Sequence, residues 1–311
     1  MTTGVDGRQA IRLPVPVEEM FTALAPRTVG PLTVPPLVRN TGPAGVYTGL
    51  ADAMERGARL TEVDAAGAVA GVVVQNPLPV AVLLVDGEEI AGAKQDRIIN
   101  LSVLVPAGAR LPVPVSCVES GRWGGAGSFS AAPRTASPRL RRGKAEALCG
   151  GPREPGRAQG RVWDEVRSMS RSAGSRSATQ AYAGVVEARS ERVAATIAAF
   201  PVVPGQCGAV VALGGRPVCV DVLSRADVFA DLWPRLLAGY AADAADAPAP
   251  ARAPLRRRDL VRLLKAVSVV PLDAAPSAGA GVDVRGASGP LEVTGLLDPL
   301  GELVQLSAYV R

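Results

Sequence analysis

Residues 80–123 read VAVLLVDGEEIAGAKQDRIINLSVLVPAGARLPVPVSCVESGRW, and the turns within this stretch decide the fold. The apolar run at 80–85 is followed by Asp-Gly at 86–87, a dipeptide that favours the two-residue turn of a β-hairpin. Residues 97–105 and 111–119 flank the sequence PAGAR, which predicts a second hairpin with a longer loop. Because short turns of this kind join antiparallel strands, the stretch predicts an antiparallel sheet.

Hairpins and helices are expected in the chain after residue 160. Strand-like residues 209–222 surround a Gly-Gly pair, and residues 291–310 surround Asp-Pro-Leu-Gly, so each segment predicts a hairpin. Helices are expected at 182–200 and 258–268. The predicted fold class is α+β, with an antiparallel β-rich N-terminal part followed by hairpin-plus-helix units. No alternating strand and helix pattern indicates a Rossmann fold.

The chain contains no histidine among its 311 residues. This composition excludes the Ser-His-Asp and Cys-His mechanisms and histidine-ligated metals. Acid–base chemistry must therefore use Asp, Glu, Lys, Cys, Tyr or Arg. The net charge of +5 rests on arginine, because Lys94, Lys144 and Lys265 are the only lysines. We interpret this bias as a property of the genome rather than as a sign of nucleic-acid binding.

The sequence predicts a soluble protein of the cytoplasm. No apolar stretch reaches the roughly 18 residues that a membrane span needs, and we expect no membrane partner. The N-terminus lacks the basic start and apolar run of a secretion signal. The four cysteines, Cys117, Cys149, Cys207 and Cys219, show no CxxC spacing and are expected to be free thiols in a reducing compartment.

Residues 85–123 are denser in polar side chains than folding requires. Glu89 and Glu119 are the candidate catalytic residues, because two carboxylates can act as acid and base. The expected ligand-binding residues are Lys94, Arg97 and Arg122 as anion clamps, Gln95 and Asn100 as orienting groups, and Trp123 as a stacking surface. The pattern predicts no metal ligands and leaves the cofactor unknown. The alternative is that these charges pair with one another in a structural network.

Four motifs resemble those of one protein family. They are GEEIAGAKQDRIINLSVLVPAG (87–108), VPVSCVESGRW (113–123), QGRVWDEV (159–166) and GAVVALGGRPVCVDVLSRADVFADLWPRLLAGYAADA (208–244). Together they resemble the ARG and rhodanese-phosphatase-superfamily-associated protein family, the first of two families so named, in which ARG means ADP-ribosylglycohydrolase. The genomic association behind that name implies a link to ADP-ribose, NAD or phosphoester metabolism. The resemblance identifies no catalytic residue and brings no settled activity.

The resemblance also divides the chain. Residues 20–244 carry it and are expected to form one domain, preceded by an N-terminal tail at 1–19. Within that domain residues 128–158 are rich in Gly, Pro, Ser and Arg, and we expect an exposed loop with the RLRRGK run at 139–144 in solvent. Residues 245–311 are expected to supply a linker, a helix and a C-terminal β-hairpin that pack on the same domain.

The sequence supports two functions and does not decide whether the chain is an enzyme. The first is a ligand-binding or enzymatic domain that acts on a nucleotide-like small molecule of the ADP-ribose type. The alternative is a non-catalytic interaction or scaffold protein that serves a partner enzyme. Convergence of at least three predicted site residues in one open cleft favours the first function, and a closed salt-bridge network favours the second.

Overall fold

The computed structural model describes residues 9–43, 45–64, 66–125, 127–149, 156–248 and 255–311. The chain divides into two compact units. The first unit, so named hereafter, consists of Met1–Gly45, Pro201–Asp231 and Ala247–Arg311. The second unit consists of Val46–Phe200 and Leu232–Asp246.

An antiparallel sheet of eleven strands is the framework of the first unit. Its main order is β1-β17-β18-β19-β20-β16-β15-β4-β3, and β5 pairs with both β15 and β2. The predicted hairpins at 209–222 and 291–310 are confirmed as β15–β16 and β19–β20. The strands are β1 (Gln9–Ile11), β2 (Phe21–Ala23), β3 (Arg27–Val29), β4 (Leu32–Val34), β5 (Pro36–Arg39), β15 (Gln206–Leu213), β16 (Arg216–Leu223), β17 (Leu272–Pro276), β18 (Val282–Ser288), β19 (Leu291–Leu297) and β20 (Leu303–Val310).

Local chemistry explains the turns of both hairpins. Gly214 and Gly215 adopt φ angles of 58° and 79°, the left-handed conformation that a two-residue hairpin turn requires. In the β19–β20 turn the Asp298 carboxylate accepts the backbone N–H groups of Leu300 at 2.8 Å and Glu302 at 2.9 Å. Each turn is therefore fixed by residues within it, which is why the sequence pattern predicted both hairpins.

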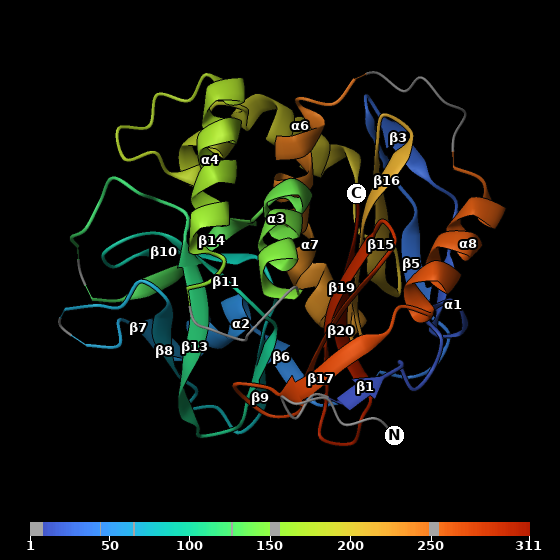
Figure 1. Cartoon of the computed structure of the whole chain (residues 1–311), viewed down its shortest axis with the longest axis horizontal. Coiled ribbons are helices and arrows are strands. Elements are labelled where there is room, and N and C mark those ends of the chain that lie inside the picture. The colour runs from blue at the N-terminus through green and yellow to red at the C-terminus, as the bar shows by residue number, and fades with distance from the viewer. Residues whose placement is uncertain (1–8, 44, 65, 126, 150–155, 249–254) are drawn as a thin grey trace. The chain divides into compact units, whose positions relative to one another are not determined.

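Helices α1 (Val17–Met20) and α8 (Arg257–Ser268) complete the core of the first unit. Leu260, Leu264 and Val267 lie on one face of α8 and are buried in a cluster with apolar residues of the sheet. Figure 1 shows α8 beside α1, and the two helices are in contact. The apolar face of α8 follows the period of an α-helix, and the helix predicted at 258–268 is confirmed.

Two smaller sheets form the second unit. The first has six strands in the order β14-β10-β11-β13-β8-β7, all antiparallel. The second has the order β12-β9-β6, in which β6 and β9 pair in parallel. The strands are β6 (Tyr47–Gly49), β7 (Arg59–Thr61), β8 (Gly71–Gln75), β9 (Ala81–Leu84), β10 (Glu88–Gly92), β11 (Arg97–Ile99), β12 (Val103–Val105), β13 (Arg110–Cys117) and β14 (Phe129–Thr135).

The Asp-Gly pair at 86–87 does not close a hairpin, so that prediction is wrong. Strand β9 pairs with β12 and β6, whereas β10 pairs with β11 and β14, so the turn carries the chain from one sheet to the other. The hairpin predicted around PAGAR is half right. Strands β11 and β13 pair antiparallel as expected, but the segment between them leaves the sheet to form β12. A dipeptide predicts a turn and not which strands pair across it.

Helices surround the two sheets of the second unit. They are α2 (Leu50–Glu55), α3 (Pro138–Cys149), α4 (Gln159–Ala173), α5 (Tyr182–Glu187) and α6 (Ser190–Ala199), and α7 (Ala226–Ala244) begins in the first unit and ends in the second. The single helix expected at 182–200 is therefore two helices. The chain leaves the helical conformation at Arg189, where φ is −120° and ψ is 16°.

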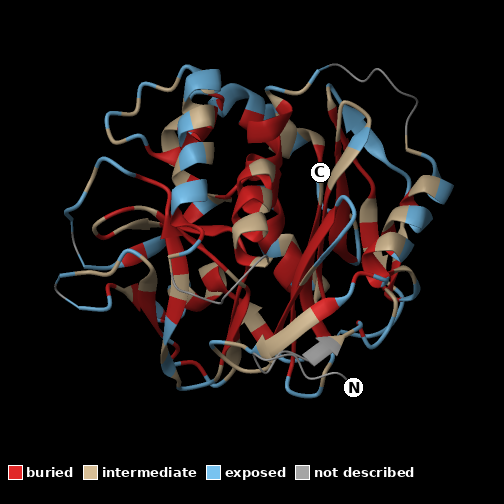
Figure 2. Ribbon diagram, viewed as in Figure 1, coloured by how far each residue is buried: buried red, intermediate tan, exposed pale blue. Residues whose placement is uncertain are grey.

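The exposed loop expected at 128–158 is wrong for its described residues. Residues 129–135 form β14 and residues 138–149 form α3, whereas 150–155 lie outside the described residues. Figure 2 shows α3 largely buried, and the side chains of Arg141 and Lys144 are fully buried. Two basic residues of the run at 139–144 are therefore not the solvated charge that its composition indicated, whereas Arg139 and Arg142 are partly exposed.

Buried acids at residues 86–89 explain this burial of basic side chains. Lys144 of α3 pairs with Asp86 and also donates to the backbone carbonyls of Ile99 and Asn100. Arg235 of α7 pairs with Glu88 at 2.7 Å. A carboxylate can be buried only when a cation and hydrogen bonds replace its water, so these ion pairs attach two helices to one turn.

The α+β fold class is confirmed, with antiparallel pairing throughout the described strands except between β6 and β9. Among the described residues, no helix has the length and apolar character needed to cross a membrane. The domain limits at 1–19, 20–244 and 245–311 stay a prediction. Strand β1 lies within the expected tail, the C-terminal strand β20 pairs with β16, and part of the expected linker lies outside the described residues.

We predict that Gly87→Ala destabilises the protein more than Gly108→Ala. Both glycines have positive φ angles, 84° and 68°, so alanine at either position costs about 1–2 kcal/mol in the left-handed conformation. Only at Gly87 does the added Cβ also meet a buried side chain, 2.2 Å from Cδ of Arg141. Chemical denaturation measures the two losses, and equal losses would contradict the close packing of Arg141 on this turn.

Candidate functional site

The register of the six-stranded sheet places the predicted site residues on two faces. Arg97 is paired with Ile90 on β10 and with Cys117 on β13, so these three side chains share one face. Glu89 is paired with Ile98 and points to the opposite face. The charged residues of the 85–123 segment therefore form two groups rather than the single cluster that the sequence indicated.

Arg97 belongs to a closed ion pair. Its side chain is fully buried, and Nη2 lies 2.9 and 2.8 Å from the two carboxylate oxygens of Glu62. Nη1 donates to the backbone carbonyls of Ala68 at 2.7 Å and Gly71 at 2.8 Å. The guanidinium also lies 5.3 Å from the centre of the Phe129 ring. These contacts fasten β11 to the β7–β8 region, which is a structural use of the charge.

Glu89 is fully buried beneath the other face and pairs with Arg134 of β14. Arg134 donates from Nε at 2.8 Å and from Nη2 at 2.6 Å. The β10–β14 ladder is irregular at Glu89, which gives the two side chains room to meet. Burial raises the pKa of Glu89 to about 7, although Arg134 opposes this, and the nearby carboxylates of Asp96 and Glu119 add to it.

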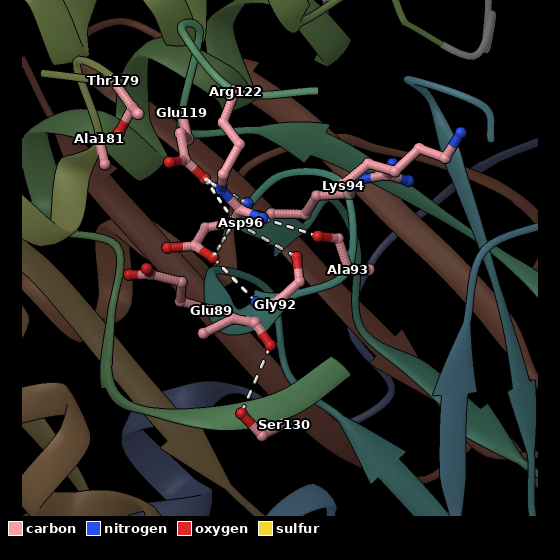
Figure 3. Close-up of polar contacts among 12 residues, drawn as sticks. Glu89, Gly92, Ala93, Lys94, Asp96, Glu119, Arg122, Ser130, Thr179 and Ala181 are labelled. Carbon is pink, nitrogen blue, oxygen red and sulfur yellow. Dashed lines mark hydrogen bonds and ion pairs between the residues drawn. The ribbon is translucent and has the colours of Figure 1, made fainter. Parts of the chain in front are cut away.

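Asp96 and Glu119 meet at the guanidinium of Arg122, as Figure 3 shows. Nη2 of Arg122 lies 3.1 Å from Asp96 Oδ1 and 2.6 Å from Glu119 Oε2. Asp96 closes the β10–β11 turn, where its carboxylate accepts the N–H of Gly92 at 2.9 Å. The N–H of Asp96 in turn donates to Glu119 at 3.1 Å, so the turn and the end of β13 hold both carboxylates in place.

The surroundings shift the pKa values of these two carboxylates in opposite directions. Burial raises the pKa of Asp96, the adjacent Glu119 adds to the rise, and the Gly92 N–H and Arg122 oppose it. Burial would also raise the pKa of Glu119, but hydrogen bonds from Arg122, Thr179 and the Asp96 N–H outweigh it. The pKa of Glu119 therefore lies below its usual value. The hydrogen bonds to Glu119 thus favour its ionised form, whereas burial disfavours the ionised form of Asp96.

Residues 174–184 run beside this pair of carboxylates. The N–H of Gly121 donates to the carbonyl of Thr179 at 2.9 Å, and the N–H of Tyr182 donates to the carbonyl of Val118 at 2.8 Å. A Cβ at Gly121 would lie 2.8 Å from the Thr179 Cα, so only glycine permits this approach. The close approach brings the Thr179 hydroxyl to Glu119, and Figure 3 shows Thr179 and Ala181 near that carboxylate.

A pocket of about 630 Å³ opens between the carboxylates and this segment. Asp96 and Glu119 supply one side, and residues of the 174–188 segment supply the rest. The lining residues on that segment are Gly174, Ser175, Arg176, Ser177, Thr179, Ala181, Ala183, Gly184, Glu187 and Ala188. Its polar groups are hydroxyls, one guanidinium and carboxylates, so it can hold a hydrogen-bonding ligand beside a proton donor and an anion.

The other predicted residues lie outside the lining of this pocket. Lys94 donates to the carbonyl of Ala66 at 2.7 Å and lies 5.4 Å from the centre of the Trp123 ring, which is 49% exposed. Gln95 and Asn100 are buried. Asn100 receives Lys144 at its backbone carbonyl, and its side-chain oxygen has no hydrogen-bond partner among the described residues. Glu119 is thus the one predicted residue that lines the pocket.

Sequence reasoning did not select Asp96, Arg134 or Thr179. Asp96 lies inside the polar segment 85–123, and this position was an available signal. Arg134 was missed because its strand was taken for loop, although Phe129, Ala132 and Thr135 of that strand are buried. Thr179 reaches Glu119 only through tertiary contact, and no local pattern points to it. Within the described residues, no group of three or more Cys, Asp or Glu is arranged to hold a metal ion.

The fold and the site define the class: an α+β protein with two carboxylates in unlike surroundings that line one polar pocket. The chain belongs to the ARG and Rhodanese-Phosphatase-superfamily-associated Protein domain family, whose model matches residues 21–309. The resemblance seen in the motifs is confirmed and extends nearly to the C-terminus. Neither the curated proteins nor the solved structures contain a match to the chain.

We predict that Glu89 makes the protein less stable as the pH rises from about 4.5 to about 7. The pKa of Glu89 is 4.5 in its ordinary state and about 7 when folded, so in this range the folded protein binds more protons than the unfolded chain. The unfolding free energy then falls by up to about 1.4 kcal/mol per pH unit. Glu89→Gln removes this slope. Chemical denaturation from pH 5 to 8 measures the unfolding free energy of both proteins. The same pH dependence for the two would show that Arg134 keeps Glu89 ionised throughout.

We predict that Arg97→Ala lowers the unfolding free energy by about 3–5 kcal/mol, because it leaves the Glu62 carboxylate buried without its cation. Arg56→Ala is the matched control. Arg56 pairs with Asp52 at 2.9 Å on the surface, and such pairs contribute about 0.5 kcal/mol. Urea denaturation compares the two variants. A loss below about 1 kcal/mol for Arg97→Ala would refute the structural role of the pair.

Proposed function

We propose that the chain binds a nucleotide-like small molecule in the pocket at Asp96 and Glu119 and acts on it by acid–base chemistry. The ligand would belong to ADP-ribose, NAD or phosphoester metabolism. The placement of both carboxylates in one pocket, where Glu119 accepts more hydrogen bonds than Asp96, carries the proposal. Two neighbouring acids in unlike surroundings can divide the roles of proton donor and base. In a chain without histidine, carboxylates are the natural groups for this work.

The pocket itself supports a small-molecule ligand. Its volume of about 630 Å³ falls within the roughly 300–1,000 Å³ usual for such sites. The hydroxyls of Ser175, Ser177 and Thr179 supply hydrogen-bonding groups along one wall. The family name, which links these proteins to ARG and rhodanese-phosphatase proteins, supports a ligand from the same metabolism.

The alternative, an interaction protein that serves a partner enzyme, has its own support. Arg97 and Glu89 are both engaged in closed, buried ion pairs, and seven of the eight residues proposed from sequence lie outside the pocket lining. These contacts indicate that much of residues 85–123 serves folding. These ion pairs include no residue that lines the pocket, however. The proposed site therefore consists of Asp96 and Glu119, and the ion pairs do not contradict it.

We predict that ADP-ribose binds to the wild-type protein and that Ala183→Trp abolishes binding. Ala183 lines the pocket on α5, so the indole ring would fill the cavity without changing any charge. Ala195→Trp, at an exposed position on α6 outside the lining, is the matched control and should bind normally. Isothermal titration calorimetry measures both, with melting temperatures to confirm that each variant is folded.

Two outcomes would count against this proposal. Binding of equal affinity to the Ala183→Trp variant would place the ligand elsewhere on the chain. Absence of any heat of binding with ADP-ribose and with NAD would favour the interaction protein, since a scaffold has no need of either ligand.

A further inference from the structure

We infer that this pocket receives the sugar ring of a glycoside and that the bond broken there is the glycosidic bond. The anomeric carbon lies at Asp96 and Glu119, and any phosphate of the ligand stays at the rim beside Arg176. This inference rests on the proposed function and narrows it, because it excludes the phosphoester as the reacting group. Four features of the pocket lead to it.

The charges of the lining disfavour a phosphate at the inner end. Asp96 and Glu119 are almost buried there, whereas Arg176 and Glu187 are exposed at the rim. A phosphate placed there would meet the negative charge of Glu119 in a setting that screens it poorly. Among the described residues the exposed guanidinium of Arg176 is the one cation of the lining, so an anionic group is best accommodated at the rim.

Arg122 cannot offset this repulsion because its donors are already directed elsewhere. Nε donates to Glu119 at 2.9 Å, and Nη1 donates to the carbonyls of Ala93 at 2.6 Å and Gly124 at 3.0 Å. Nη2 faces Asp96 at 3.1 Å and the carbonyl of Gly92 at 3.4 Å. A guanidinium has five N–H donors, and these contacts use all of them. Arg122 is therefore a positioning residue for the two carboxylates and not a clamp for an incoming anion.

The walls of the pocket match a ring that carries hydroxyl groups. Ser175, Ser177 and Thr179 are half-buried and present hydroxyls, which can both donate and accept. Apart from the rim residues Arg176 and Glu187, the other positions of this segment that line the pocket are glycine and alanine, and no described lining residue is aromatic. A nucleobase binds best where an aromatic ring can stack on it, so the pocket suits the sugar rather than the base.

The two carboxylates also match the electronic demand of glycoside cleavage. The transition state is oxocarbenium-like and positive, and an ionised Glu119 beside it stabilises that charge. We assign the acid to Asp96 because Glu119 accepts more hydrogen bonds, from Arg122, Thr179 and the Asp96 N–H, and is therefore held as the anion. In its protonated form Asp96 gives its proton to the leaving atom as the bond from that atom to the anomeric carbon breaks, with the electron pair going to the leaving group. Water forms the new bond to the anomeric carbon, and Glu119 takes the proton that the water loses. The products are the free sugar and the protonated leaving group.

The first test compares two bonds that share one leaving group. The substrates are p-nitrophenyl D-ribofuranoside, as both anomers, and p-nitrophenyl phosphate, each followed by release of p-nitrophenolate. We expect release from one ribofuranoside anomer and none from the phosphate. Release from the phosphate alone would overturn the inference. A protein that binds ADP-ribose but cleaves neither ribofuranoside would also overturn it, while leaving the proposed binding function intact.

The second test separates the roles of the two carboxylates. Phenol is a poor leaving group and needs a proton, whereas p-nitrophenolate leaves without one. Asp96→Asn should therefore lower kcat/KM about 10²- to 10⁴-fold for phenyl ribofuranoside and far less for the p-nitrophenyl compound. Glu119→Gln should lower kcat/KM for both. Asp164→Asn, which changes an exposed carboxylate of α4, is the matched control. Equal losses on the two substrates for Asp96→Asn would indicate a structural role and overturn the assignment.

A third variant tests the rim and does not alter the carboxylates. Arg176→Ala should weaken binding of ribose 5-phosphate relative to ribose, because it removes a cation from the rim. Arg171→Ala, at an exposed arginine in the last turn of α4 outside the lining, is its control. Calorimetry with both sugars measures the difference. An unchanged preference for ribose 5-phosphate in Arg176→Ala would overturn the placement of the phosphate.

Discussion

The second unit depends on the pairing of the buried carboxylates at residues 86–89 with cations from three distant elements. Asp86, Glu88 and Glu89 pair with side chains of α3, α7 and β14 respectively. Each acid has given up its water, and an uncompensated buried charge costs several kcal/mol. The turn can therefore be buried only when all three elements are in place. This requirement makes the packing of the second unit cooperative rather than a sum of local contacts.

The ion pairs of residues 86–89 position the candidate site but do not line it. The pairing of Glu89 with Arg134 fixes β10 against β14, and β10 leads into the turn that carries Asp96. Arg122 then joins that turn to the end of β13, where Glu119 lies. The pocket wall at 174–184 is free of these ion pairs. A rigid charged framework thus holds two carboxylates, and a separate hydroxyl-bearing segment faces them, which is the division expected of a preorganised site.

The sequence predicted those elements whose signals are local. The hairpins β15–β16 and β19–β20 follow from turn residues whose own backbone and side chains fix the turn. Helix α8 follows from its apolar face. The prediction for 128–158 was wrong because basic side chains usually indicate an exposed segment. Here the burial of Arg134 and Lys144 depends on acids at 86–89, some fifty residues earlier in the chain. Glu119 as a site residue stays a prediction, and Asp96 was not predicted, because the sequence does not show which carboxylates line a pocket.

The sequence by itself determined the family, the α+β class and the restriction of acid–base chemistry to residues other than histidine. Only the tertiary structure decided which charges are structural. Glu89 and Glu119 look alike in sequence, yet one lies against Arg134 in a closed pair and the other lines a pocket beside Thr179. Desolvation and neighbouring charges set the pKa of each carboxyl, and both depend on residues distant in the chain. The sequence pattern and composition do not show the surroundings of each carboxyl group, because the folded structure sets them.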